Sequence, residues 1–153
     1  MSDAGNSMPL ATRLRELVWG SSDYEEFCRL RQRYLRAPLG QDLYDEDLAA
    51  EQAHRHFGLY CDDELIGGAV FVTGADGTAQ LRQMLVAPEY RRHGLGHRIV
   101  RHVEAAAREA SIQLLFLEAR LEAVEFYRRC GYRRVGDEFF HVTIPHVRME
   151  KSL

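Results

Sequence analysis

The chain contains 153 residues, of which 46% are apolar and 28% are charged. A chain of this length buries enough apolar surface to fold as one domain without a disulfide or a metal. The composition excludes a disordered chain and a collagen-like fibre, and no apolar run reaches the ~20 residues of a membrane span. We therefore predict a soluble single domain over residues 1–153, with its folded core over about 12–151.

The N-terminus and the cysteines together predict a cytoplasmic location. Residues 1–9 are polar and lack the apolar stretch of a signal peptide. Cys28, Cys61 and Cys130 are odd in number and far apart, which argues against a disulfide framework. Histidine pairs with formal ligand spacing lack the cysteine or carboxylate that would complete a metal site, so we expect no metal.

Charge is distributed unevenly along the chain, whose net charge is −3. Residues 80–135 contain 11 arginines and six acidic residues, a local charge of +5, whereas the rest of the chain carries −8. Arginine binds phosphate oxygens through a planar fork, so this excess suits a polyphosphate ligand, although charge alone favours an ordinary solvated helix face. The isoelectric point near 6.2 and the lack of a binding motif argue against nucleic acid as a partner.

The first half of the chain has the pattern of a strand, a helix and a strand hairpin. Ser22 is a candidate helix cap, because acidic residues follow it in the first turn, and Pro38 and Gly40 end the helical pattern. The predicted elements are a strand over 12–19, a helix from Ser22, a loop with a short helix over 41–53, and paired strands over 54–61 and 65–73.

The second half alternates strands with helices. Apolar residues recur every three or four positions over 94–110, which predicts an amphipathic helix. The remaining predicted elements are a strand over 79–87, a buried strand over 112–117, a helix over 122–130 ended by Gly131, and strands over 132–137 and 139–149. Together these elements predict a mixed α/β sheet in a single layer that is covered by helices.

A glycine-containing turn joins the strand over 79–87 to the helix over 94–110. The first amides of a helix lack partners and carry partial positive charge, and glycine lets the main chain approach a phosphate. Arg91 and Arg92 add cationic donors beside Gly94. The turn is not a P-loop, because no Gly-Lys-Ser/Thr follows, and it lacks the third glycine of a dinucleotide fingerprint. The sequence therefore predicts a turn that binds a diphosphate.

Two motifs resemble those of the GNAT N-acetyltransferase superfamily. Residues 91–96 (Arg-Arg-His-Gly-Leu-Gly) match its Q/R-x-x-G-x-G/A motif, and residues 123–132 are similar to its A-x-x-F-Y-x-x-x-G-F/Y signature. The tail over 144–149 resembles the ending of the ElaA-like branch. The resemblance implies the acyl-CoA N-acyltransferase fold, a mostly antiparallel α/β sheet of about seven strands flanked by about four helices.

The resemblance also implies acetyl-CoA as co-substrate and a primary amine of a small molecule or peptide as acceptor. Tyr127 would be the general acid that protonates the departing thiolate. The main-chain amides of residues 92–96 would hold the pyrophosphate. The implied cofactor-binding residues are Met84, Leu85 and Val86, along which the pantetheine arm would pair as an extra strand, together with Arg91, Arg92, His93, Gly94, Leu95, Gly96, Arg120, Phe126 and Arg129.

The sequence departs from the family pattern at the position of the base. Residues 79–87 lack the carboxylate that many relatives use, and Arg120 stands where many have an asparagine that contacts pantetheine. Glu118, at the end of a buried strand, is the remaining candidate for the base, and a structural ion pair with an arginine is its equal alternative. His146 or water are the other candidates.

We predict direct transfer, because no base is readable beside Cys130 for an acetyl-cysteine route. A catalytically weak CoA-binding or regulatory module of the same fold stays an alternative, as does a general nucleotide-binding protein. The acidic residues of the N-terminal half favour a cationic acceptor. The sequence leaves open which acceptor is used, whether another acyl-CoA is preferred, and whether the protein is a monomer or a homodimer.

Overall fold

The computed structural model of the chain describes residues 11–153, so the polar segment over 1–9 lies outside the described residues. The strands are β1 (Thr12–Leu17), β2 (Arg55–Cys61), β3 (Glu64–Thr73), β4 (Thr78–Val86), β5 (Leu114–Arg120), β6 (Arg133–His141) and β7 (Ile144–Ser152). The α-helices are α1 (Ser22–Arg31), α2 (Leu95–Glu109) and α3 (Val124–Arg129). Shorter helical segments are the π-helix η2 (Gln32–Arg36) and the 3-10 turns η3 (Ala37–Leu39), η4 (Leu43–Asp45), η5 (Leu48–Ala53), η6 (Pro88–Tyr90) and η7 (Leu121–Ala123).

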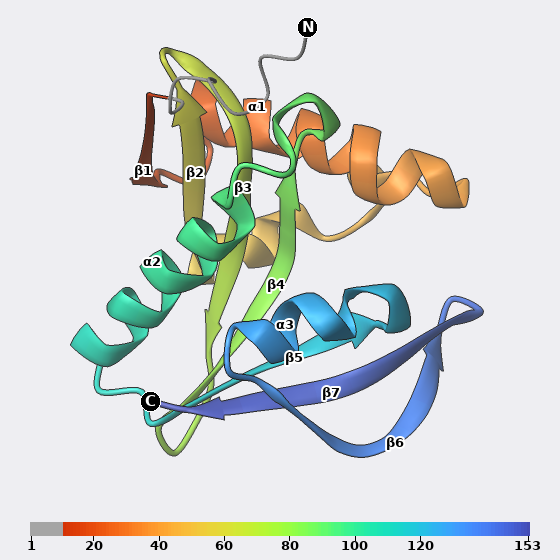
Figure 1. Cartoon of the computed structure of the whole chain (residues 1–153). Coiled ribbons are helices and arrows are strands. Elements are labelled where there is room, and N and C mark those ends of the chain that lie inside the picture. Colours follow the sequence, from red (N-terminus) through yellow and green to blue (C-terminus); the bar gives the residue numbers. More distant parts are fainter. Residues whose placement is uncertain (1–10) are drawn as a thin grey trace, which may run out of the picture.

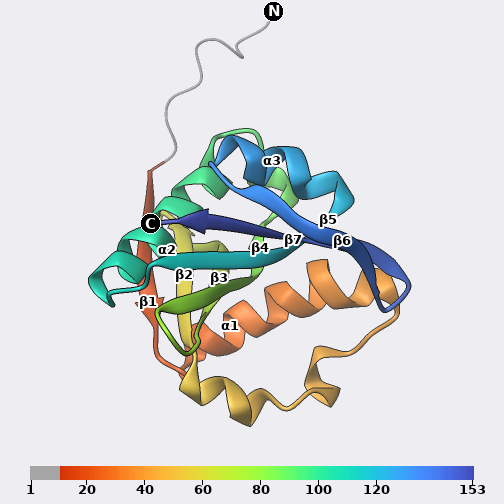
Figure 2. The same ribbon diagram turned by 90° about the horizontal axis from the view of Figure 1, so that it is seen from below.

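The strands form one mixed sheet with the order β1-β2-β3-β4-β5-β7-β6. Neighbouring strands are antiparallel except for β4 and β5, which are parallel. Helix α1 covers one face of the sheet, whereas α2 and α3 cover the other (Figures 1 and 2). This arrangement confirms the predicted seven-stranded sheet flanked by about four helices, with 3-10 turns standing where a short helix was expected over 41–53.

Each face of the sheet carries its own apolar cluster, because successive strand side chains point to opposite faces. The cluster under α2 and α3 includes Leu59, Phe71, Leu81, Ile99, Val103, Leu115 and Met149. The cluster under α1 consists of Leu17, Phe27, Tyr60, Leu65, Val70 and Leu85. The apolar stripe predicted over 94–110 is buried as expected, and its removal from water fixes α2 on the sheet.

Two element boundaries differ from the sequence prediction. The cap of α1 is Ser21 rather than Ser22, since the Ser21 hydroxyl accepts a hydrogen bond from the amide of Tyr24 at 3.2 Å. The break expected between the two C-terminal strands is wrong, because β6 continues through it with a bulge at Gly136, where φ is +78°. The chain reverses instead at Val142–Thr143, which places the hairpin tip next to the site described below.

Neither a membrane-spanning helix nor a cluster of metal ligands occurs within residues 11–153. No helix in this range is long and apolar enough to cross a membrane. No group of three or more His, Cys, Asp and Glu side chains in it could hold a metal ion. His56, one of the residues with formal ligand spacing, instead directs Nε2 at the main-chain oxygen of Glu51 at 2.9 Å.

Candidate active site

The two parallel strands of the sheet separate soon after they begin. Residues 78–80 of β4 pair with residues 114–116 of β5, and beyond them the strands diverge (Figure 1). A cleft of about 1150 Å³ lies at this opening. Its walls come from β4, β5, the segment after α1, the start of α3 and the tip of the β6–β7 hairpin. The edge of β4 that faces the cleft therefore has no strand partner within the described residues.

A bulge in β4 shapes this free edge. Two residues of β4, Gln83 and Met84, stand opposite the single residue Ala69 of β3, and Gln83 has a φ of +52°. Gly67 makes room for the bulge, because a Cβ atom built there would lie 2.5 Å from the main-chain oxygen of Leu85. The bulge lies in the stretch of β4 that has no strand partner on its cleft side within the described residues, and such an edge suits pairing with an extended ligand.

The turn before α2 offers a concave row of main-chain amides. Arg92 and Gly94 both have left-handed backbones, with φ of +68° and +74°. Within residues 11–153, the amides of 92–97 make no hydrogen bond. Alternating backbone conformations of this kind form anion-binding sites, and the start of α2 adds its dipole. The predicted diphosphate turn thus has the geometry that such a ligand needs.

The two glycines of this turn, Gly94 and Gly96, are required for different structural reasons. A Cβ built at Gly94 meets no atom within 4 Å, so the space beside it is open to a ligand. A Cβ at Gly96 would lie 3.0 Å from the Phe126 ring and 3.8 Å from the Met84 methyl group. Gly96 therefore lets Phe126 of α3 pack on the turn, and Met84 connects the turn with the cleft.

The arginines predicted to bind the cofactor make different contacts. Arg91 donates through Nε to the main-chain oxygen of Val86 at 3.1 Å, which ties the turn to the end of β4. Arg129 is exposed and pairs with Glu125 at 3.1 Å. Arg92 is exposed and forms no ion pair with any residue that the structure describes. Of these three arginines, Arg92 thus has the guanidinium with the fewest contacts to residues 11–153, and it is the one most available to a ligand.

Tyr127 is held rigidly by the way α3 ends. Gly131 adopts a φ of +97°, and the amide of Tyr132 donates to the main-chain oxygen of Tyr127 at 3.0 Å, as in a Schellman motif. The side chain is 9% exposed and its hydroxyl reaches the cleft, 4.0 Å from the sulfur of Met84. Burial raises the pKa of Tyr127 well above its ordinary value, so the phenol keeps its proton.

The opposite wall of the cleft carries the candidate bases. Glu118 lines the cleft but is exposed, and no ion pair with an arginine is found for it within residues 11–153. The ion pair weighed as its structural role is therefore absent there. Arg120 stands opposite His146 in the β5–β7 register, so it lies in this wall beside a candidate base.

His146 has a defined orientation in this wall. Its Nδ1 lies 2.8 Å from the main-chain oxygen of Ile144. Because a carbonyl oxygen only accepts, Nδ1 donates to it, and Nε2 is the ring nitrogen that is left for a ligand. The ring stacks on Phe139 at 6.0 Å between centroids and meets His141 edge-on at 5.7 Å. His146 therefore has a defined ring orientation in which Nε2 makes no hydrogen bond to any of residues 11–153.

Cys130 has a neighbouring base that the sequence did not reveal. Its Sγ lies 3.3 Å from Nδ1 of His97, which comes from the first turn of α2. Burial nevertheless raises the pKa of the Cys130 thiol, which disfavours the nucleophilic thiolate. Cys130 is also outside the residues that line the cleft. The pair therefore lends no support to an acetyl-cysteine route.

Sequence reasoning missed Gln83 and the two arginines that contact it. Arg31 and Arg36 both donate to its side-chain oxygen. The signal was present in α1, where Arg31 occupies a position of the apolar stripe and is fully buried. A charged residue on such a stripe is rarely buried unless it is paired, so it points to a polar partner in the core.

Comparison with known proteins gives the family. Residues 26–153 match the family model described as "Acetyltransferase (GNAT) domain". The chain belongs to the GNAT acetyltransferase family. The Bacillus subtilis protein named "Uncharacterized N-acetyltransferase YjcF" is 30% identical to this GNAT protein over 103 residues, which are 67% of this chain and 73% of the relative.

Solved structures show the same fold. Escherichia coli ElaA has a TM-score of 0.78 at 17% identity, with 92% of this chain and 99% of ElaA covered. An aminoglycoside 6'-N-acetyltransferase complexed with coenzyme A has a TM-score of 0.77 at 15% identity, with 92% and 96% covered. At these identities the likeness is one of fold. As a GNAT acetyltransferase, the protein has acyl-CoA-dependent N-acetyl transfer as its general activity.

Proposed function

We propose that this GNAT protein transfers the acetyl group of acetyl-CoA directly to a primary amine of a small molecule or peptide. The observation that carries the proposal is the position of the Tyr127 hydroxyl. It reaches the cleft beside the free edge of β4, and its single hydrogen-bond partner within residues 11–153 is the Met84 sulfur at 4.0 Å. Since a thioether is a weak acceptor, the hydroxyl stays available to a ligand in the cleft.

The chain offers a continuous path for acetyl-CoA, which supplies an activated thioester when bound. The unpaired amides of 92–97 would hold its diphosphate, with Arg92 beside them. The unpaired edge of β4 at 84–86 would pair with its pantetheine arm. The open space at Gly94 and the contact of Met84 with Gly96 connect the two parts, so the residues present fit the group.

The described residues then divide the chemistry among themselves. A main-chain amide of residues 84–86 polarises the carbonyl oxygen, and the rigid cleft orients the amine toward the carbonyl carbon. As the new C–N bond forms and the C–S bond breaks, Tyr127 gives its proton to the departing sulfur. The amine loses a proton to a base on the opposite wall, and solvent returns a proton to Tyr127. Orientation and fixed dipoles supply much of the rate.

Two residues are proposed as the base, Glu118 and His146. The contacts favour His146, because its ring is held through Nδ1 with Nε2 left for a ligand, whereas no hydrogen bond within residues 11–153 orients the exposed Glu118 side chain. The variants Glu118→Gln and His146→Gln separate them in profiles of kcat/KM against pH. The variant that loses the acidic limb of the profile identifies the base. Retention of that limb in both variants assigns the proton transfer to water.

The charge of the cleft supports a cationic acceptor. Glu46 is neutralised by its ion pair with Arg36 at 2.6 Å. The other acidic residues of the cleft outnumber Arg82 and Arg120, and they are Asp42, Asp45, Glu118 and Glu122. A wall with an excess of carboxylates attracts an amine in its protonated form. The bound ammonium group then gives its proton to the nearby base.

The proposal is tested by binding first and turnover second. Calorimetry should detect association of acetyl-CoA, and thermal stabilisation by CoA should clearly exceed that by ATP or NAD. Release of free CoA should then occur with at least one member of a panel of polyamines, amino acids, aminoglycosides and peptide N-termini. Absence of any heat with acetyl-CoA refutes the proposal, whereas binding without release with every amine supports the weak CoA-binding module instead.

A further inference from the structure

The bulge of β4 is held by a side-chain clamp. Gln83 is a non-glycine residue with a left-handed backbone, a conformation that is unfavourable for an L-residue. Its side-chain oxygen accepts one hydrogen bond from Nε of Arg31 at 2.8 Å and another from Nη2 of Arg36 at 3.0 Å. Two guanidinium groups, one from α1 and one from η2, thus meet on one carboxamide oxygen.

The π-helical segment η2 brings the two arginines together. Arg31 and Arg36 are five residues apart, and in an α-helix such residues point in directions roughly 140° apart. Over η2 the chain adopts the wider π-helix, in which residues five apart lie over one another. The π-helix therefore turns Arg36 onto the side of Arg31, and such segments occur frequently at functional sites.

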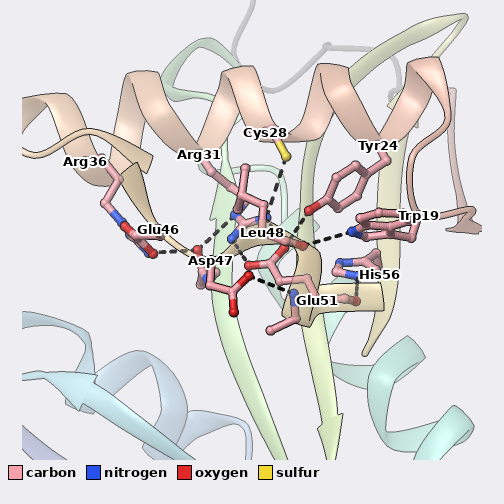
Figure 3. A network of polar contacts seen from close by, with 12 residues as sticks. Trp19, Tyr24, Cys28, Arg31, Arg36, Glu46, Asp47, Leu48, Glu51 and His56 are labelled. Carbon is pink, nitrogen blue, oxygen red and sulfur yellow. Dashed lines mark hydrogen bonds and ion pairs between the residues drawn. The ribbon is translucent and has the colours of Figure 1, made fainter. Parts of the chain in front are cut away.

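Arg31 is itself fixed by a buried ion pair. Its side chain is 0% exposed, and it donates to both carboxylate oxygens of Glu51, at 2.8 and 2.6 Å. The hydroxyl of Tyr24 donates to the same carboxylate at 2.8 Å (Figure 3). Although burial opposes it, the Arg31 guanidinium holds the pKa of Glu51 below its ordinary value, so the pair stays charged. The ion pair with Glu51 therefore fixes the position from which Arg31 donates its Nε hydrogen to Gln83.

Arg36 links the same oxygen of Gln83 to Glu46 in the wall of the cleft. Its Nε donates to Glu46 at 2.6 Å, a contact drawn in Figure 3, and both residues line the cleft. The segment after α1 is further tied down by Gln32, whose side-chain oxygen accepts from the amide of Leu43 at 2.7 Å. The clamp thus joins the segment over 36–46 to the strand that carries Met84.

We propose that Arg31 and Arg36 are positioning residues that act through Gln83. They hold the bulge of β4 so that the edge over 84–86 faces the cleft in the orientation that transfer requires. The inference rests on the proposed function, because it assigns that edge to the thioester. Misplacement of a reacting group by ~1 Å can lower a rate about 100-fold, so a clamp on this edge has a measurable consequence.

The test replaces the acceptor atom and keeps its surroundings. Gln83→Leu removes the oxygen at nearly constant size, and Gln83→Glu keeps an oxygen that both arginines can reach. Tyr24→Phe is the matched control, because it removes one buried hydrogen bond to Glu51 and leaves both bonds from Arg31 to Glu51 and both bonds to Gln83 in place. Thermal unfolding of all three variants records the purely structural cost.

The first readout needs no ligand. Hydrogen exchange of the amides over 82–86 should accelerate at least about 10-fold in Gln83→Leu, while Gln83→Glu and Tyr24→Phe stay close to the wild type. Unchanged exchange of this segment in Gln83→Leu overturns the proposal. Should Gln83→Leu fail to fold, Arg36→Met gives the same comparison, since it removes one donor and leaves the buried pair intact.

The second readout is kinetic. In Gln83→Leu, kcat should fall at least about 10-fold and by a clearly larger factor than the Kd of acetyl-CoA rises, because the diphosphate turn is a separate segment that keeps its contacts. Gln83→Glu should restore kcat, and Tyr24→Phe should lower the melting temperature without lowering kcat. If kcat falls in proportion to the loss of melting temperature in all three variants, the positioning role is overturned. If the wild type itself binds no acetyl-CoA, the proposed function fails, and the exchange measurement still decides whether the clamp exists.

Discussion

The proposed diphosphate turn is tested most directly at Gly94. This residue has a φ of +74°, and a Cβ built on it meets no atom within 4 Å. Gly94→Ala therefore creates no clash inside the protein, and its structural cost is the left-handed backbone, about 1–2 kcal/mol. For a domain of this size, that cost lowers the melting temperature by about 2–8 °C. The added methyl group would stand in the space through which a phosphate approaches the amides of 92–97.

Gly20 provides a matched control for this substitution. It has a φ of +82° and likewise no atom within 4 Å of a built Cβ, but it lies in the turn between β1 and α1. Gly20→Ala should therefore cost as much stability as Gly94→Ala. In the acetyl-CoA titration the two should differ, with Kd unchanged in Gly20→Ala and raised at least about 10-fold, or ~1.4 kcal/mol, in Gly94→Ala.

Scanning calorimetry and isothermal titration of the two variants give the comparison. Equal melting temperatures with a selective loss of affinity in Gly94→Ala are the expected pair of results. Equal Kd values in the two variants would show that the ligand does not approach the main chain at Gly94. The assignment of the turn to the diphosphate would then be wrong, whatever the activity of the protein.

Three other sets of variants test the acid, the buried pair and the buried histidine. Tyr127→Phe should lower kcat by about 10²–10⁴-fold with an unchanged Kd for acetyl-CoA, and a change in KM alone would contradict the acid role. Glu51→Ala should lower the free energy of urea unfolding by about 3–5 kcal/mol, because it leaves Arg31 buried without a partner. The double variant Arg31→Met with Glu51→Leu should lose less stability than either single change. Additive losses of stability would contradict a coupled pair. Burial lowers the pKa of His56, so as the pH falls below ~6.5 the unfolded chain takes up the proton first and the free energy of unfolding decreases. His56→Gln should flatten this decrease between about pH 6.5 and 5, and an unchanged slope would assign it to other groups such as His102, whose pKa burial also lowers.

Local patterns predicted the parts of the site that depend on neighbouring residues. The stripe of α2 follows from three-and-four spacing, and the open turn before it follows from Gly94 and the start of a helix. Tyr127 was located through the A-x-x-F-Y motif, and the C-terminal glycine of that motif is the residue that ends α3 and fixes the tyrosine. These features need no knowledge of the tertiary structure, so they were predictable.

The parts that failed depend on contacts between distant segments. The exposure of Glu118 follows from the divergence of β4 and β5, which no local pattern records. The base beside Cys130 comes from His97, 33 residues earlier, through the packing of α3 on α2. The turn of β6 into β7 was misplaced because Val142 and Thr143 have β-branched side chains, which are unusual at positive φ.

The bulge of β4 depends on Gly67 of β3 and Gln83 of β4 together, so neither residue alone predicts it from the sequence. Gly67 removes the side chain that would meet the Leu85 oxygen at 2.5 Å, so it permits the bulge without holding it. Gln83 supplies the oxygen that holds it, but only because η2 turns Arg36 onto the side of Arg31. A glycine at position 83 would relieve the backbone strain and lose the clamp. Glutamine at this left-handed position therefore combines backbone strain with a held side chain, which is the combination that the proposed positioning role of Arg31 and Arg36 expects.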